Sequence, residues 1–155
     1  CRPSIIRGNA SEIIALYNAG MQTKGVDTTE SSESALSPAK TLARQAKAIV
    51  VVSGETDYIT NGKDVNKVEN GTILMARVTG MGCTATAVVA AFAAVNPDML
   101  EASTHAMAIM GITGEIAASH SRGNGSLQVN FLDELCTIDG ETIRKYLKQT
   151  PHETF

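Results

Sequence analysis

The stretch Val78-Thr79-Gly80-Met81-Gly82-Cys83 runs directly into an apolar, alanine-rich segment at 84–95. Two glycines favour a tight turn, and the residues that follow are strong helix formers. A turn that opens a helix in this way leaves the first backbone N–H groups without intrahelical partners. These N–H groups and the positive end of the helix dipole can bind an anion. We therefore expect an anion site formed by the backbone of Gly80, Met81, Gly82 and Cys83.

The same spacing has a second interpretation. A Gly-x-Gly turn before an apolar helix is common, and many such turns bind nothing. This one has neither the third glycine of the dinucleotide-binding fingerprint nor the Gly-Lys-Ser/Thr of a P-loop. Spacing alone leaves both interpretations open.

The five residues Thr79-Gly80-Met81-Gly82-Cys83 resemble the Thr-Gly-x-Gly-Cys signature of the hydroxyethylthiazole kinases, enzymes of thiamine salvage in the ribokinase-like superfamily. Most members of that superfamily have Gly-Ala-Gly-Asp at this turn, with the Asp as base. The resemblance implies that Cys83 stands at the catalytic position of that Asp and that Gly80 binds the substrate.

A second group of residues lies near the start of the chain. Ser4–Arg7 has the pattern of a short buried strand, and Asn9 and Glu12 have the spacing of a helix capping box. Asn9-x-x-Glu12 also matches a ribokinase-like motif whose Glu is associated with Mg²⁺, usually through water. By the same resemblance, Arg7 contacts the phosphates of ATP. The capping box and the metal site remain alternatives for Glu12.

A continuous β-branched run at 48–52 predicts a central strand that ends at Ser53. The resemblance places Ser53 at a position where the family usually has a Thr that touches ATP. A hydroxyl that only satisfies the strand end is the alternative.

The remaining segments complete the predicted fold. Residues 57–78 predict short antiparallel strands with turns at Asn61-Gly62 and Asn70-Gly71, residues 121–127 a loop, and residues 151–155 a frayed tail. Strands and helices otherwise alternate, which favours an α/β fold. With the resemblance, we expect a ribokinase-like three-layer α/β/α sandwich with a mainly parallel central sheet.

Composition limits the possible functions. The 155-residue chain has 43% hydrophobic residues, a net charge of −3 and no basic run, which argues against a nucleic-acid surface. No segment has the pattern of a signal peptide or the length of a membrane span. Three cysteines fit no zinc or redox spacing, so we expect free thiols in a reducing cytoplasm.

The chain opens on Cys1-Arg2-Pro3 and almost at once on a strand. We therefore expect residues 1–155 to be a single ribokinase-like domain that lacks its N-terminal portion, the C-terminal fragment of a longer kinase domain. In the family, the missing N-terminal segment supplies part of the thiazole pocket, and the site lies between subunits of a homotrimer.

The resemblance as a whole implies ATP-dependent phosphorylation of the hydroxyl of 4-methyl-5-(2-hydroxyethyl)thiazole, with Mg²⁺ and with ATP as co-substrate. One alternative is another ribokinase-like vitamin kinase, acting on a hydroxymethylpyrimidine or pyridoxal. A second alternative is a nucleotide-binding fragment without catalysis.

Overall fold

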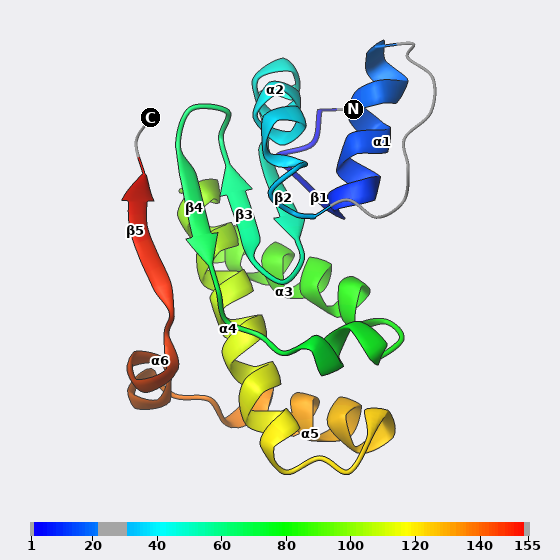
Figure 1. Cartoon of the computed structure of the whole chain (residues 1–155). Helices are drawn as coiled ribbons and strands as arrows, with labels where there is room; N and C mark the ends of the chain where they lie inside the picture. The colour runs from blue at the N-terminus through cyan, green and yellow to red at the C-terminus, as the bar shows by residue number, and fades with distance from the viewer. Residues whose placement is uncertain (1, 22–30, 154–155) are drawn as a thin grey trace.

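A computed structural model describes residues 2–21 and 31–153 of the chain. Its centre is a five-stranded sheet in the order β1-β2-β3-β4-β5 (Figure 1). The strands span Ile5–Asn9 (β1), Ile49–Ser53 (β2), Asp57–Thr60 (β3), Val65–Val68 (β4) and Gln149–Glu153 (β5). The helices are Ala10–Met21 (α1), Leu36–Ala46 (α2), Met81–Val95 (α3), Met99–Ser119 (α4), Asn124–Thr137 (α5) and Gly140–Tyr146 (α6), with a 3₁₀ helix η1 at Ile73–Arg77.

The direction of the strands corrects one expectation. We predicted a mainly parallel sheet, but only β1 and β2 pair in parallel, while the β2–β3, β3–β4 and β4–β5 pairings are antiparallel. The reason is the length of the connections. Parallel neighbours need a long crossover, which α1 and α2 provide between β1 and β2, whereas residues 54–56 and 61–64 can only reverse the chain. The Asn61-Gly62 hairpin is confirmed, with Gly62 at a φ of 93°.

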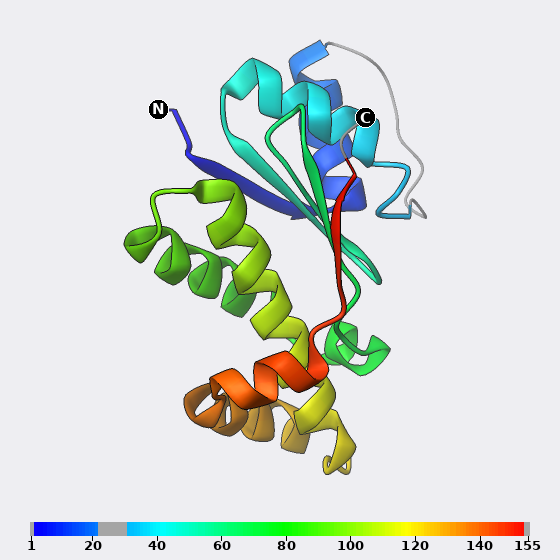
Figure 2. The same ribbon diagram turned by 90° about the vertical axis from the view of Figure 1, so that its left-hand side faces the viewer.

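The helices form a layer on each face of the sheet (Figure 2). Helices α1 and α2 cover one face, where residues such as Ile13 and Ala43 pack against Val50 and Val52. Helices α3 and α4 cover the other face, where Val89 and Met107 belong to the same cluster as Val51 and Ile59. The chain therefore has an α/β fold with helices on both faces of its sheet. Alternation along β2 sends Val50 and Val52 to one side and Val51 to the other.

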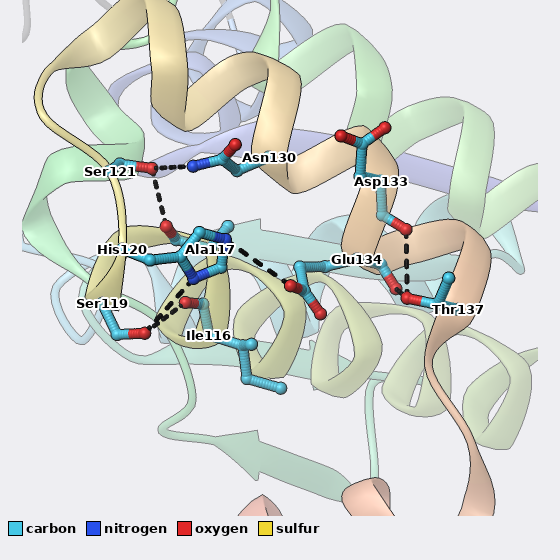
Figure 3. A network of polar contacts seen from close by, with 9 residues as sticks. All are labelled: Ile116, Ala117, Ser119, His120, Ser121, Asn130, Asp133, Glu134 and Thr137. Atoms are coloured by element: carbon cyan, nitrogen blue, oxygen red, sulfur yellow. Dashed lines mark hydrogen bonds and ion pairs between the residues drawn. The ribbon is translucent and has the colours of Figure 1, made fainter.

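The end of α4 is fixed to α5 by a polar network rather than by a long loop (Figure 3). The hydroxyl of Ser121 donates to the carbonyl of Ala117 at 2.6 Å and accepts from the amide of Asn130 at 2.9 Å. His120 Nε2 lies 3.6 Å from a carboxylate oxygen of Glu134. The predicted loop at 121–127 is therefore too long, because α5 already begins at Asn124.

Two other expectations about irregular segments are wrong. Asn70-Gly71 does not form a hairpin; the chain continues into the 3₁₀ helix η1. Residues 151–153 are not frayed, because they belong to β5, which pairs with β4. Asn70 accounts for both outcomes. Its side chain donates to the carbonyl of Tyr146 at 2.8 Å and accepts from the N–H of Lys148 at 2.8 Å, so it ties the end of α6 to the sheet.

The described helices include none long and apolar enough to cross a membrane. Cys83 and Cys136 are free and exposed, as predicted, while Cys1 lies outside the described residues. The predicted polar loop around residues 22–30 also lies outside them.

Gly111 in α4 generates a prediction about stability. A Cβ atom at Gly111 would overlap the backbone carbonyl of Asn70, which cannot move without disturbing the anchor just described. We expect Gly111→Ala to lower the free energy of unfolding by about 1–3 kcal/mol, the usual cost of overpacking. Denaturant unfolding measures this. Gly125→Ala in α5 is the matched control, because open space surrounds Gly125. Equal stability of the two variants would contradict the prediction.

Candidate active site

Arg7 joins three elements at one end of the sheet. Its Nη2 donates to the hydroxyl of Ser53 at 2.8 Å, which links β1 to β2. Its Nη1 donates to the carbonyl of Gly82 at 3.0 Å, 75 residues later in the chain, which links the sheet to α3. The buried Nε of Arg7 has no acceptor among the described residues. An unpaired buried donor is costly, so this guanidinium is suited to an additional acceptor such as a phosphate or water.

The start of α3 lies beside this guanidinium. Gly80 is the N-cap with a φ of 88°, a conformation that glycine adopts without strain. The N–H of Met81 donates to the carbonyl of Val78 at 3.3 Å, so it is not free. The N–H groups of Gly82 and Cys83 have no backbone or side-chain acceptor in the described part of the chain. The start of α3 therefore offers two unpaired amides and has the Arg7 guanidinium beside it, and both kinds of group can bind an anion.

An open cleft of about 360 Å³ unites the predicted residues of the two segments. Arg7 and Glu12 line it from one side, and Gly82 and Cys83 line it from α3. Its other lining residues are Ile6, Gly8, Ile13, Leu16 and Thr86. Ser53 lines a neighbouring cleft of about 500 Å³ between the ends of β1 and β2, together with Asn9 and Thr56. Gly80 lines neither cleft and lies at the N-cap of α3.

Glu12 forms the predicted capping box. The N–H of Asn9 donates to Glu12 Oε2 at 2.8 Å, and the N–H of Glu12 donates to Asn9 Oδ1 at 2.9 Å. Glu12 remains exposed at the edge of the cleft, and its second carboxylate oxygen is not part of the cap. Within the described residues, no three His, Cys, Asp or Glu side chains gather as a metal site. A single carboxylate is enough to hold an ion such as Mg²⁺, because this ion keeps most of its water ligands and also binds phosphates.

Asp57 is a residue near the site that the sequence analysis missed. It begins β3, is only 7% exposed, and its carboxylate accepts from the N–H of Gly54 at 2.9 Å. Burial raises the pKa of Asp57 from 3.8 to about 7, although the Gly54 hydrogen bond and the charge of Arg7 both lower it. The sequence does contain a signal for this residue: Asp57 directly precedes Tyr58 and Ile59 in a predicted strand, so a carboxyl group stands next to residues that are usually buried.

Fold and site together define the class of protein. This is an α/β protein with an open cleft of mixed polar and apolar lining at the end of its strands, where a guanidinium, the start of a helix, a thiol and a carboxylate lie together. Such an arrangement suits the binding of a phosphorylated ligand. The sequence model of the Hydroxyethylthiazole kinase family matches residues 1–141. The chain belongs to the hydroxyethylthiazole kinase family.

Individual relatives agree with this assignment. The hydroxyethylthiazole kinases of Leptospira biflexa serovar Patoc and Granulibacter bethesdensis are each 50% identical to the chain, over 94% and 92% of it. The alignments cover 54% and 52% of those relatives. The structure of a hydroxyethylthiazole kinase protein from Pyrococcus horikoshii OT3 matches with a TM-score of 0.85 at 33% identity, covering 97% of this chain and 55% of that one. The chain thus spans about half the length of the relatives that it matches.

The buried carboxylate of Asp57 predicts a dependence of stability on pH. The pKa of Asp57 is raised in the folded state. The contribution of Asp57 to the free energy of unfolding is therefore fully present below about pH 4 and is lost as the pH rises through about 7. A pKa raised from 3.8 to about 7 corresponds to about 4 kcal/mol. We expect Asp57→Asn, which keeps an acceptor for Gly54, to exceed wild type in stability by about 2–4 kcal/mol at pH 8 and by much less at pH 4.

Unfolding curves at several pH values test this expectation. The matched control is Asp133→Asn, which makes the same chemical change at an exposed position of α5. A constant difference between Asp57→Asn and wild type from pH 4 to pH 8 would contradict the raised pKa.

Proposed function

We propose that this chain forms the C-terminal part of a kinase that phosphorylates the hydroxyl of 4-methyl-5-(2-hydroxyethyl)thiazole with ATP, in thiamine salvage. One observation carries the proposal. The two motifs shared with the family, around Arg7 and around Cys83, are far apart in the chain but line one cleft, and Arg7 bonds directly to Gly82. The names of the relatives support the same activity.

The proposed roles follow from the groups present. Arg7 and Ser53 bind the phosphates of ATP, and the free N–H groups of Gly82 and Cys83 bind the transferred phosphoryl group. Gly80 lies at the end of α3 that receives the thiazole substrate. Glu12 holds Mg²⁺ through water, and the ion would neutralise phosphate charge. Cys83, exposed in the cleft, faces the substrate hydroxyl.

In the reaction, the hydroxyl oxygen forms a bond to the γ-phosphorus of ATP, and the bond from that phosphorus to the bridging oxygen breaks. ADP leaves with the bonding electrons, and the hydroxyl proton passes to Cys83 or to water. The transition state of phosphoryl transfer is loose, so positioning and charge stabilisation supply most of the rate. The residues described above provide both.

The proposal extends to the rest of the protein. We infer a ribokinase-like domain whose N-terminal portion completes the thiazole pocket, and a homotrimer in the cytoplasm with sites between subunits. The relatives, about twice as long as this chain, support the first part of this proposal.

The test uses the full chain by itself and the full chain joined behind the N-terminal part of the Leptospira biflexa relative, referred to below as the fused enzyme. We expect the fused enzyme to produce ADP only when both MgATP and the thiazole alcohol are present. A panel with a hydroxymethylpyrimidine and pyridoxal distinguishes the other vitamin kinases. Binding of ATP without turnover on any alcohol would indicate a nucleotide-binding protein without catalysis.

Arg7 provides the first test of the site. We expect Arg7→Ala to weaken ATP binding by about 1.5–3 kcal/mol, the range for hydrogen bonds to a charged group. Titration calorimetry with MgATP on the fused enzyme measures the dissociation constant. Arg144→Ala removes an arginine from an exposed position of α6 that lines neither cleft, so this variant should bind ATP like wild type. An unchanged dissociation constant for Arg7→Ala would remove this residue from the site.

Three variants at the start of α3 compare the contribution of the Cys83 thiol with that of the backbone N–H groups of Gly82 and Cys83, called the backbone cradle below. The loose transition state of phosphoryl transfer depends mainly on positioning and charge stabilisation, so we expect Cys83→Ser to retain measurable turnover. Cys83→Asp should work at least as well as wild type. Gly82→Val should cost more than either, because a Cβ at Gly82 would lie 3.3 Å from Arg7 Nη1 and would displace the guanidinium.

Turnover numbers of the fused enzyme decide between these alternatives. An inactive Cys83→Ser together with an active Gly82→Val would mean that the thiol carries the chemistry and the cradle does not.

A further inference from the structure

Three polar side chains stand side by side at one end of the sheet. Arg7 of β1, Ser53 of β2 and Asp57 of β3 occupy neighbouring strands, and pairing of Asn9 with Ser53 and of Val52 with Tyr58 brings the ends of these strands together. The Ser53 hydroxyl contacts the guanidinium. The row therefore runs from a cation through a hydroxyl to a buried carboxylate.

Strand alternation puts all three on the face covered by α3 and α4. Val51 and Ile59 belong to the core cluster on that face, and the partly buried Ile5 packs against it. Arg7 and Ser53 lie two residues after Ile5 and Val51, and Asp57 lies two residues before Ile59, so each side chain points to the same side. The carboxylate is thus on the side of the sheet where Arg7 meets Gly82.

Burial of Asp57 is otherwise unfavourable. Aspartate is rarely buried unless it is paired. Asp57 is 7% exposed, with one hydrogen bond from the Gly54 N–H, and the described residues place no cation in direct contact with it. The charge that favours its ionised form is that of Arg7, which acts from the other end of the row.

Charged groups on the other neighbouring elements act elsewhere. Lys67 lies in β4 and Glu69 directly follows that strand; the Lys67 ammonium is 3.7 Å from the Glu69 carboxylate. Lys67 also lies over the ring of Tyr58, on the opposite face of the sheet. Glu115 of α4 is bound to Lys148 at 2.9 Å. Arg77 of η1 is exposed. Of these charged groups, Arg7 is the one whose charge acts on Asp57, in addition to the larger effects of burial and of the Gly54 hydrogen bond.

We propose that the buried carboxylate of Asp57 responds to the charge at Arg7: it is ionised on the same face of the sheet as the guanidinium in the ligand-free protein, and it takes up a proton when nucleotide phosphates bind to Arg7. The inference rests on the proposed function, because it takes ATP as the ligand at Arg7. A polyphosphate at the guanidinium offsets the positive field that keeps Asp57 ionised. The proton comes from the buffer, and no bond other than the O–H of the carboxyl group is formed.

The coupling predicts the pH dependence of binding. Near and above pH 7, the carboxylate of the ligand-free protein is ionised in a large share of molecules, and binding must add a proton to it. Affinity for the polyphosphate then falls as the pH rises, by at most about tenfold for each pH unit. A side-chain amide does not titrate in this range, so Asp57→Asn serves as a permanent neutral substitute of the same shape.

The experiment is titration calorimetry of MgATP, and of inorganic tripolyphosphate, into the full chain between pH 6 and 8.5. Each titration is run in two buffers with different ionisation enthalpies, which gives the number of protons taken up. At pH 8 we expect wild type to take up a fraction of a proton more than Asp57→Asn. We also expect Asp57→Asn to bind about three- to tenfold more tightly at pH 8.5 and equally at pH 6. Asp133→Asn should follow wild type, and the same ligand and buffers cancel other ionisations.

The outcomes separate this inference from the proposed function. Binding of MgATP with identical proton uptake and parallel pH curves in wild type and Asp57→Asn would overturn the role of Asp57 and leave the kinase proposal in place. Weaker binding by Asp57→Asn at every pH, in a variant whose thermal unfolding shows it is folded, would mean that the site needs the charged carboxylate, and would also overturn the inference. Failure of wild type to bind either probe would overturn this inference, and turnover by the fused enzyme would then decide the kinase proposal by itself.

Discussion

The guanidinium of Arg7 holds together the part of the molecule on which the site depends. Its hydrogen bonds to Ser53 and Gly82 connect two strands and a helix that come from distant parts of the chain. Hydrogen bonds from a charged donor contribute about 1.5–3 kcal/mol each, so this one side chain has a large effect on where α3 begins relative to the sheet. The hydrogen bond from Arg7 to the Gly82 carbonyl fixes the first turn of α3, where the amides of Gly82 and Cys83 have no acceptor among the described residues.

Two groups at this end of the sheet carry unsatisfied or costly interactions. Arg7 has a buried Nε without an acceptor among the described residues, and Asp57 is a buried carboxylate at the same end of the sheet without a direct cation there. Natural proteins concentrate such unfavourable arrangements where a ligand is bound. In this chain both lie where the strands β1 and β2 end and α3 begins.

The capping role of Glu12 leaves room for its proposed role as a magnesium ligand. One oxygen of its carboxylate completes the capping box of α1, while the side chain remains exposed at the edge of the cleft lined by Cys83. The cap fixes the carboxylate in one orientation, which is what a group that holds a hydrated ion requires. The two interpretations of the Asn9-x-x-Glu12 pattern are therefore compatible in the same geometry.

The sequence by itself determined the local features: the glycine turn before α3, the capping box of α1, the buried strand β2 and the Asn61-Gly62 hairpin. These depend on backbone conformation and on contacts between residues close in the chain, which residue types report directly. Only the tertiary structure decided the mixed direction of the sheet, the 3₁₀ helix after Asn70, the pairing of β5 and the burial of Asp57. These depend on which distant segments become neighbours. A carboxyl group has the same sequence symbol whether water surrounds it or a sheet and two helices enclose it, and only the enclosure changes its charge.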